Sequence, residues 1–197
     1  MSIVTNIKQL NKPTKKVTDI KHGEVIAATL FKYLTTKTTG IGLAANQIGI
    51  DARVAVVNVQ EPIYMINPEI IETGNEINFK EGCLSIKKKK NTHTKRYDRV
   101  VVKCDNYDSN MVFEAEEGDD GLGLLECVCV QHEIDHLNGK TILDRKYTPE
   151  TLRVEKIGRN QKVVISDGSE AKIIKYKKAE KLINEGWTLQ EVLWKSI

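Results

Sequence analysis

Residues 122–138 of the chain read LGLLECVCVQHEIDHLN and contain two of its four histidines. Apolar residues and both histidines recur at helical spacing, and Asn138-Gly139 is a typical helix stop. His132 and His136 are four residues apart, so they lie on one face of a helix, and both imidazoles can reach one metal ion. The stretch therefore predicts a long, largely apolar helix that carries part of a metal site.

A chance H-E-x-x-H pattern on an amphipathic helix is the alternative to a metal site. It is disfavoured because two unpaired imidazoles on a strongly apolar helix would be costly to bury. Glu133 directly follows the first histidine, where a carboxylate can accept a proton from a water molecule. The pattern thus indicates a hydrolytic metal site.

Such a site needs a third protein ligand and an open coordination position. The extended motif His-x-x-Gly-x-x-His is excluded, because Ile142 stands at its last position and no histidine follows His136. Two sources of the third ligand stay open on spacing alone. One is a downstream carboxylate, at Asp144, Glu150 or Glu155, and the other is a cysteine elsewhere in the chain.

The segment EGCLS, residues 81–85, offers Cys83 as that cysteine. A thiolate is a suitable partner for two imidazoles, although a buried cysteine beside a turn would look the same in sequence. Cys129 is the competing thiol, three residues before His132. We expect Cys129 to line an apolar pocket instead, because an open tetrahedral site needs its third ligand from another direction than the helix.

The segment GIGLAANQIG, residues 40–49, is small and apolar. Its glycine spacing differs from that of a dinucleotide-binding loop. Small residues favour backbone that lines a pocket, and Gln47 is the side chain that could donate to an oxyanion. By itself, the segment would be interpreted as a tight connection from a helix to a strand.

In the rest of the chain, hydrophobic periodicity and turn residues predict several short helices and strands. A helix is expected over 19–35, strands over 53–59 and 63–66, and a hairpin from 100–103 and 111–114. The basic stretch 87–96 is interpreted as a loop or hairpin end and 116–120 as an acidic turn. Near the C-terminus we expect a hairpin of 162–165 and 172–176 around Asp167-Gly168, a helix over 177–185, and a last short helix capped by Thr188 and Glu191.

Composition bounds the class of protein. The chain has 197 residues, of which 40% are hydrophobic and 29% charged, which suits one domain with a small appendage. Neither a membrane-spanning apolar run nor a signal peptide is recognisable, and the four cysteines are expected to be reduced, so we expect a soluble cytoplasmic protein. The net charge of +3 is too small to predict nucleic-acid binding.

The three segments together resemble the peptide deformylase family. That family is marked in order by G-x-G-L-A-A-x-Q, E-G-C-L-S and Q-H-E-x-D-H, and this chain has GIGLAANQ, EGCLS and QHEIDH. The resemblance covers roughly residues 15–147. It implies an α+β fold in which antiparallel β-sheets surround a central metal-binding helix. The expected domains are a catalytic domain, 1–150, and a basic C-terminal β-hairpin and helix appendage, 151–197.

The resemblance also implies a role for each matching residue. The metal ligands correspond to Cys83, His132 and His136, and the general acid/base to Glu133. The oxyanion donors correspond to Gln47 and the backbone N–H of Leu84, and the substrate-binding residues to Gly42, Val128 and Cys129. The expected metal is Fe²⁺, with Zn²⁺, Ni²⁺ or Co²⁺ as substitutes.

The implied activity is removal of the N-formyl group from the N-terminal methionine of newly synthesised proteins, with release of formate. A zinc endopeptidase of the H-E-x-x-H type is the alternative, although it leaves EGCLS and GIGLAANQ unexplained. A degenerate fold kept for binding is disfavoured because every implied catalytic residue is present. The expected partners are formylmethionyl nascent peptides, with no membrane and no specific nucleic acid.

The positive charge is concentrated in the appendage. Residues 151–197 hold 10 basic and 6 acidic residues, a balance of +4, whereas residues 1–150 hold 20 and 21, a balance of −1. Two interpretations stay open. The lysines could bring the enzyme to the anionic ribosome, or the segment could pack against the domain through its apolar residues, which are Trp187, Leu189, Val192, Leu193 and Trp194.

Overall fold

The computed structural model describes residues 1–86, 91–115, 121–147 and 157–193. The chain divides into two compact units, Met1–Tyr147 and Thr148–Ile197, which are described separately. Several features predicted above lie outside the described residues: the start of the basic stretch (87–90), the acidic turn (116–120), Glu150, Glu155 and Trp194.

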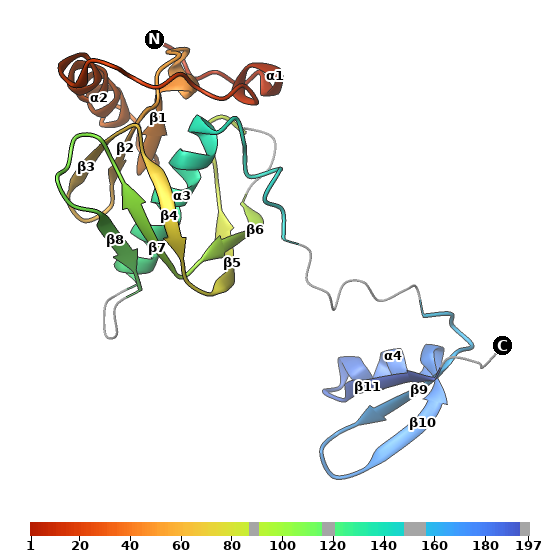
Figure 1. Ribbon diagram of the computed structural model, residues 1–197. Coiled ribbons are helices and arrows are strands. Elements are labelled where there is room, and N and C mark those ends of the chain that lie inside the picture. The colour runs from red at the N-terminus through yellow and green to blue at the C-terminus, as the bar shows by residue number, and fades with distance from the viewer. Residues whose placement is uncertain (87–90, 116–120, 148–156, 194–197) are drawn as a thin grey trace. The chain divides into compact units, whose positions relative to one another are not determined.

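The first unit combines short helices with antiparallel strands (Figure 1). Its helices are α1 (Ile7–Leu10), α2 (Ile20–Leu34), the 3₁₀ helix η1 (Ala45–Ile48) and α3 (Leu122–Leu137). Its strands are β1 (Gly42–Ala44), β2 (Val54–Asn58), β3 (Pro62–Ile66), β4 (Glu69–Thr73), β5 (Glu76–Glu81), β6 (Thr92–Tyr97), β7 (Arg99–Lys103) and β8 (Met111–Glu114). They form three sheets, β1-β2-β3, β4-β7-β8 and β5-β6.

Strand β2 lies between two helices. Its side chains alternate in direction, so Val54 and Val56 pack with α2, whereas Ala55 and Val57 belong to the core around α3. Four successive residues of β2 are therefore buried, which explains its uninterrupted apolar sequence. The predicted strands 53–59 and 63–66 are confirmed as β2 and β3.

Helix α2 confirms the helix predicted over 19–35. Asp19 caps its first turn, because the side-chain oxygen Oδ1 accepts a hydrogen bond from the Lys21 N–H at 3.0 Å. Apolar residues one turn apart on one face, Ile26, Leu30 and Leu34, are buried against the β1-β2-β3 sheet. Helix α2 therefore covers one face of the β1-β2-β3 sheet.

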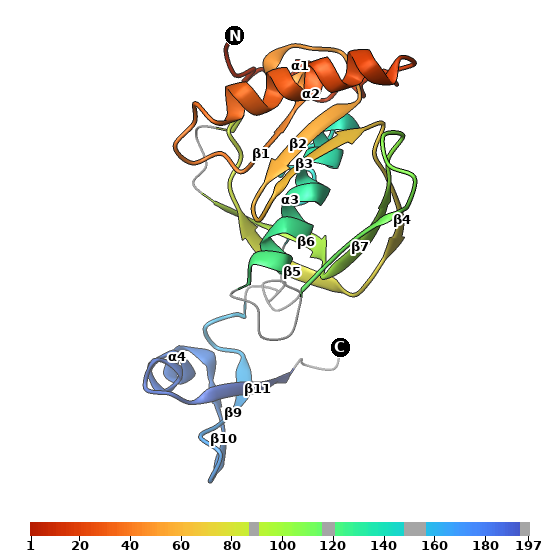
Figure 2. The same cartoon turned by 90° about the vertical axis from the view of Figure 1, so that its left-hand side faces the viewer.

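The sheets surround α3, which runs through the middle of the unit (Figure 2). Residues 127–137 of this helix are all buried. Val130 and Ile134 share one core with Val100 and Phe113 of the β7–β8 hairpin, which confirms the hairpin predicted there. The predicted helix stop is also confirmed, because Gly139 adopts a left-handed conformation (φ 70°) directly beyond α3.

The second unit is a three-stranded antiparallel sheet with one helix. Its order is β10-β9-β11, from β9 (Lys162–Ser166), β10 (Ala171–Lys175) and β11 (Thr188–Leu193), with α4 (Tyr176–Asn184) between β10 and β11. Val163 and Ile165 form a small core with Ala179 of α4, and Trp187 packs onto it. The predicted hairpin and the helix over 177–185 are confirmed.

The last short helix predicted from Thr188 and Glu191 is wrong, because this segment is strand β11. It pairs antiparallel with β9, which would otherwise present an unpaired edge. The Thr188 hydroxyl donates to the Ser166 carbonyl at 3.0 Å and so acts across the sheet, where a helix cap would have been expected. The pairing of backbone groups outweighs the local capping pattern.

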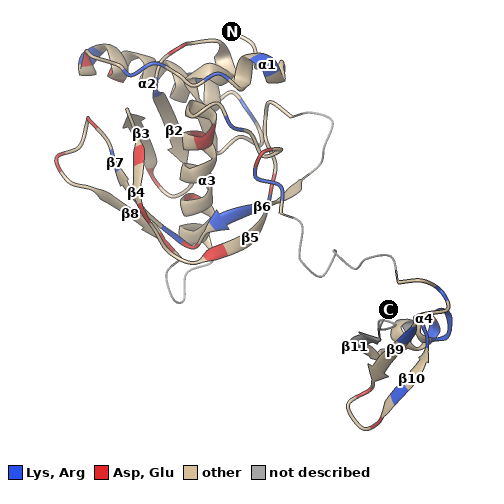
Figure 3. Cartoon of the chain, turned by 45° about the vertical axis from the view of Figure 1, so that its right-hand side comes forward, with Lys and Arg blue, Asp and Glu red and all other residues tan. Residues whose placement is uncertain are grey.

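Most described basic residues of the second unit lie on α4 and β10 (Figure 3). Lys177, Lys178 and Lys181 are exposed on α4, and Lys175 is exposed at the end of β10. In the described part of the chain, no helix has the length and apolar character that crossing a membrane requires.

Candidate metal centre

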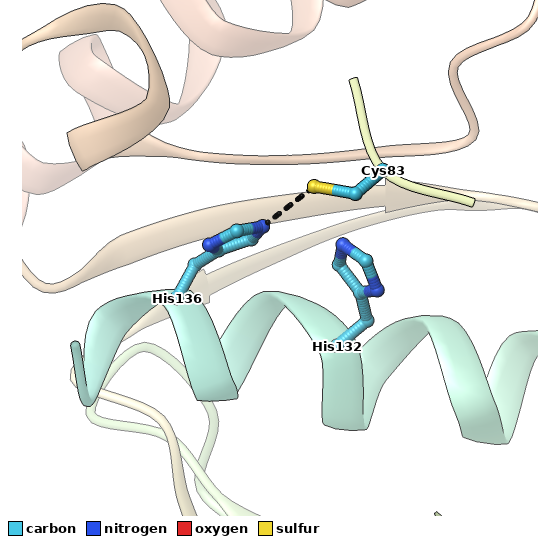
Figure 4. A group of neighbouring side chains, drawn as sticks. All are labelled: Cys83, His132 and His136. Atoms are coloured by element: carbon cyan, nitrogen blue, oxygen red, sulfur yellow. Dashed lines mark hydrogen bonds between the residues drawn. The ribbon is translucent and has the colours of Figure 1, made fainter. Parts of the chain in front are cut away.

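Helix α3 and the segment after β5 bring three metal-ligating side chains together (Figure 4). The ring centroids of His132 and His136 are 4.9 Å apart, as expected for residues on successive turns. Cys83 approaches from the other side, with its sulfur 3.2 Å from His136 Nε2. One ligand atom from each of the three residues lies within 4.8 Å of the others.

The donor set fits a first-row transition metal. One thiolate and two imidazoles suit ions such as Fe²⁺, Co²⁺, Ni²⁺ or Zn²⁺, whereas Mg²⁺ and Ca²⁺ prefer oxygen ligands. Three protein ligands leave a coordination position open, which distinguishes catalytic from structural sites. Among the described residues, this is the one group of three or more His, Cys, Asp or Glu side chains that converge in this way.

Asp144, which spacing alone left open as the third ligand, serves another purpose. Its carboxylate accepts hydrogen bonds from the backbone N–H and the hydroxyl of Thr141, at 2.8 and 3.0 Å. It is absent from the converging group. Cys83, and not Asp144, is therefore the residue that converges with the two histidines.

The two histidines have opposite electrostatic surroundings. Burial lowers the pKa of both imidazoles, and for His136 it dominates, so that pKa lies well below its ordinary value. For His132, hydrogen bonds with Cys83 and Glu81 outweigh burial and raise the pKa well above its ordinary value. Glu81 Oε2 lies 2.7 Å from His132 Nδ1. A carboxylate at Nδ1 holds the proton there and leaves Nε2 as the metal-binding nitrogen.

Glu81 is one end of a buried chain of ion pairs. Arg96 Nε donates to Glu81 Oε1 at 2.7 Å, and Arg96 Nη1 donates to Asp135 Oδ2 at 2.6 Å. Arg145 binds the same Asp135 carboxylate through both of its oxygens, at 2.7 and 2.9 Å. Only 2% of the Arg96 side chain is exposed, so its charge is stabilised by the two carboxylates rather than by water.

The sequence motifs did not predict Arg96 or Arg145, or the contact of Glu81 with His132. One signal was available in the strand THTKRY, residues 92–97. Its residues 92, 94 and 96 alternate inward, so an arginine falls on the buried face and requires a buried carboxylate partner.

Glu133 lies in a cavity of about 370 Å³ that is also lined by the candidate metal ligands Cys83 and His132. Burial raises the pKa of its carboxyl group to about 7. Its Oε2 atom has no hydrogen-bond partner among the described residues. A β-carbon at Gly42 would lie 2.5 Å from Glu133 Oε1, so the absence of a side chain at Gly42 lets the backbone pass close to the carboxylate.

Gln47 lies in the same cavity, with 1% of its surface exposed. Its Oε1 accepts a hydrogen bond from the Ala44 N–H at 2.8 Å, and its Nε2 donates to Ser85 Oγ at 3.3 Å. The backbone N–H of Leu84, next to Ser85, has no hydrogen-bond acceptor among the described residues. Two N–H donors are thus present beside the metal ligands.

The site residues implied by the family resemblance meet at this one place. The cavity is lined by Gly42, Gln47, Cys83, Leu84, Val128, Cys129, His132 and Glu133, among others. His136 completes the cluster from the next turn of α3. Burial raises the pKa of Cys129 well above its ordinary value, and its thiol donates to the Ile41 carbonyl at 3.6 Å. Cys129 is therefore a neutral thiol that lines the cavity.

We predict that Glu81→Gln weakens metal binding roughly 10–100-fold, because the variant replaces the charged acceptor of the His132 Nδ1–H and leaves Arg96 with one carboxylate. The dissociation constant for Zn²⁺ is measured by competition with a chromophoric chelator. Glu76→Gln, in the same strand, is the control, since Glu76 forms an exposed ion pair with Lys95 at 2.9 Å. Equal affinities in the two variants would contradict the role given to Glu81.

Comparison with known proteins supports the same conclusion. The sequence profile of the polypeptide deformylase family matches residues 2–151. The peptide deformylase of Carboxydothermus hydrogenoformans is 41% identical over 143 residues, covering 71% of this chain and 86% of that protein. That of Hydrogenovibrio crunogenus is 37% identical over 142 residues, covering 70% and 78%.

Solved structures agree with the sequence relatives. The peptide deformylase of Thermotoga maritima has a TM-score of 0.59 and 32% identity, covering 75% of this chain and 97% of that one. The enzyme of Synechococcus elongatus, solved with actinonin, has a TM-score of 0.63 and 29% identity, covering 77% and 81%. Nothing in these comparisons supports the zinc endopeptidase alternative. The chain therefore belongs to the peptide deformylase family, whose members are metal-dependent enzymes that remove the N-formyl group from nascent peptides.

Proposed function

We propose that Cys83, His132 and His136 hold the catalytic metal ion of this deformylase. The single observation that carries the proposal is the convergence of these three ligand atoms beside Glu133. We infer Fe²⁺ as the native ion from the family resemblance, with Zn²⁺, Ni²⁺ or Co²⁺ as substitutes, and the donor set suits all four. When bound, the ion supplies Lewis-acid chemistry that makes water a nucleophile near neutral pH.

Glu133 moves the protons in the proposed reaction. It takes a proton from the attacking water, oxygen adds to the formyl carbon, and Glu133 passes the proton to the leaving nitrogen. The carbon–nitrogen bond then breaks, giving formate and a free amino terminus. Burial favours this role, because a carboxyl group with a pKa of about 7 accepts and returns a proton near neutral pH.

Gln47 and Leu84 stabilise the negative charge that develops on the formyl oxygen. Gln47 Nε2 and the Leu84 N–H are the donors, and each is worth about 3 kcal/mol on the usual scale for such contacts. Gln47 suits the task because its Oε1 is already bound by the Ala44 N–H. The amide therefore meets the substrate with its nitrogen and not with its oxygen.

Gly42, Val128 and Cys129 bind the substrate in this proposal. Gly42 offers its backbone to the peptide, since its lack of a side chain leaves the space beside Glu133 open. Val128 and Cys129 lie one turn before His132 and supply apolar wall for the methionine side chain. Cys129 remains a neutral thiol because of its burial, so it serves as wall and not as a metal ligand.

We predict that Glu133→Gln retains one metal ion per chain and loses at least about 100-fold in kcat, because glutamine is nearly isosteric but cannot carry the proton. Formate release from formyl-Met-Ala-Ser is measured with metal content determined on the same sample. Glu126→Gln, on the same helix, is the control, since Glu126 accepts from the Gln60 N–H and is not part of the proposed machinery. Near-normal turnover by metal-loaded Glu133→Gln would remove Glu133 from the mechanism.

We further propose that the enzyme acts in the cytoplasm, at the ribosome, where formylated chains emerge. The basic residues of the second unit support this. Lys177 and Lys181 are four residues apart on α4, so two like charges share one exposed face, with Lys178 beside them. Such a face attracts an anionic surface and speeds encounter with it.

We predict that Lys177→Gln, Lys178→Gln and Lys181→Gln together weaken co-sedimentation with ribosomes roughly tenfold at low salt and reduce its salt dependence. Turnover of free formyl-Met-Ala-Ser stays normal, because these lysines are remote in sequence from the cavity. A variant with the same charge change in the first unit, Lys8→Gln, Lys12→Gln and Lys21→Gln, serves as the control. Ribosome binding that is equal in the two triple variants would contradict this proposal.

A further inference from the structure

The buried hydroxyl of Ser85 contacts the proposed oxyanion donor Gln47. Ser85 follows Leu84, and 2% of its surface is exposed. Its Oγ lies 3.3 Å from Gln47 Nε2, and Gln47 is itself 1% exposed. Neither residue can exchange this partner for bulk water, so the contact restricts how the amide can turn.

The orientation of the Gln47 amide is fixed independently of any assignment of its nitrogen and oxygen atoms. The Ala44 backbone N–H lies 2.8 Å from one amide atom of Gln47. A backbone N–H can only donate, so that atom must be the acceptor Oε1. The other atom, which faces Ser85, is therefore Nε2, with two hydrogens to donate.

The two hydrogens of Nε2 then have different surroundings. Ser85 Oγ accepts from Nε2 at 3.3 Å, and Nε2 also donates to Cys83 Sγ at 3.9 Å, on the side of the candidate metal ligands. The amide group is planar, so fixing one hydrogen on Ser85 also fixes the direction of the other. A donor held in place before the reaction loses no energy to reorientation when charge develops on the substrate.

We propose that Ser85 is a positioning residue for Gln47. Its hydroxyl holds one Nε2 hydrogen, so the second is directed into the cavity toward the formyl oxygen. The inference rests on the proposed role of Gln47 as an oxyanion donor. Ser85 itself touches neither substrate nor metal in this arrangement, so its effect on turnover is exerted through Gln47.

The test is a double-mutant cycle of Ser85→Ala and Gln47→Ala on the metal-loaded enzyme. Ser85→Ala is expected to lower kcat about threefold to tenfold, the usual range for one lost hydrogen bond, with KM for formyl-Met-Ala-Ser unchanged within twofold. The double variant is expected to be no slower than Gln47→Ala, because Ser85 has nothing to position once the amide is gone.

Two further readouts separate positioning from general damage to the fold. The ¹⁵N NMR signals of the Gln47 side-chain amide are expected to shift in Ser85→Ala, while metal content stays normal. Ser85→Thr retains the hydroxyl and is expected to restore kcat. Thr141→Val removes another buried hydroxyl, bonded to Asp144, and is expected to keep normal kcat.

The outcomes distinguish this inference from the function on which it rests. Normal kcat in Gln47→Ala would overturn the oxyanion role of Gln47, and with it the role of Ser85. A large loss in Gln47→Ala together with normal kcat in Ser85→Ala would overturn the positioning role alone. Independent losses, so that the double variant is slower than Gln47→Ala by the full Ser85→Ala factor, would also overturn it.

Discussion

The pairing of two buried charged residues on α3, His132 and Asp135, organises this enzyme. The helix is enclosed by sheets along residues 127–137, yet it carries His132, Glu133, Asp135 and His136 within five residues. An unpaired charge in such a place costs several kcal/mol. Asp135 is therefore bound by two arginines, and His132 by Glu81. These pairs connect the helix to β5, β6 and the segment after α3.

The buried ionisable residues of α3 are of two kinds: Asp135 and His132 are held by charged partners, whereas Glu133 faces the cavity. Arg96 and Arg145 saturate Asp135, and together with Glu81 they hold the ring of His132 in one orientation. Glu133 points to the cavity and has an unpartnered oxygen among the described residues. A carboxyl group that is buried without a cation on each oxygen keeps its proton to higher pH, which suits proton transfer. A histidine held in one orientation, His132, and a carboxyl group suited to proton transfer, Glu133, are thus neighbours on one helix.

The sequence predicted the elements whose apolar residues follow a regular period. Helices α2 and α3 and strands β2, β3, β7 and β8 were recognisable because one or both faces are apolar. Strand β6 was not, because its inward residues, Thr92, Thr94 and Arg96, are polar. Strand β5 was also missed, because its apolar alternation is limited to Ile77 and Phe79 and its most buried residue is Glu81. The candidate cluster of Cys83, His132 and His136 was implied by the family resemblance, through the motifs EGCLS and QHEIDH. Arg145 could not be assigned, since its partnership with Asp135 depends on tertiary packing that no local pattern encodes.

The account depends most on a thiolate ligand that comes from the segment after β5 and not from α3. Replacement of the metal by Co²⁺ tests this directly, because a cobalt–thiolate bond produces a charge-transfer absorption band in the near ultraviolet. The band is expected in the unaltered protein and in Cys129→Ala, and its loss is expected in Cys83→Ala. A band that persists in Cys83→Ala and disappears in Cys129→Ala would contradict the arrangement of the site.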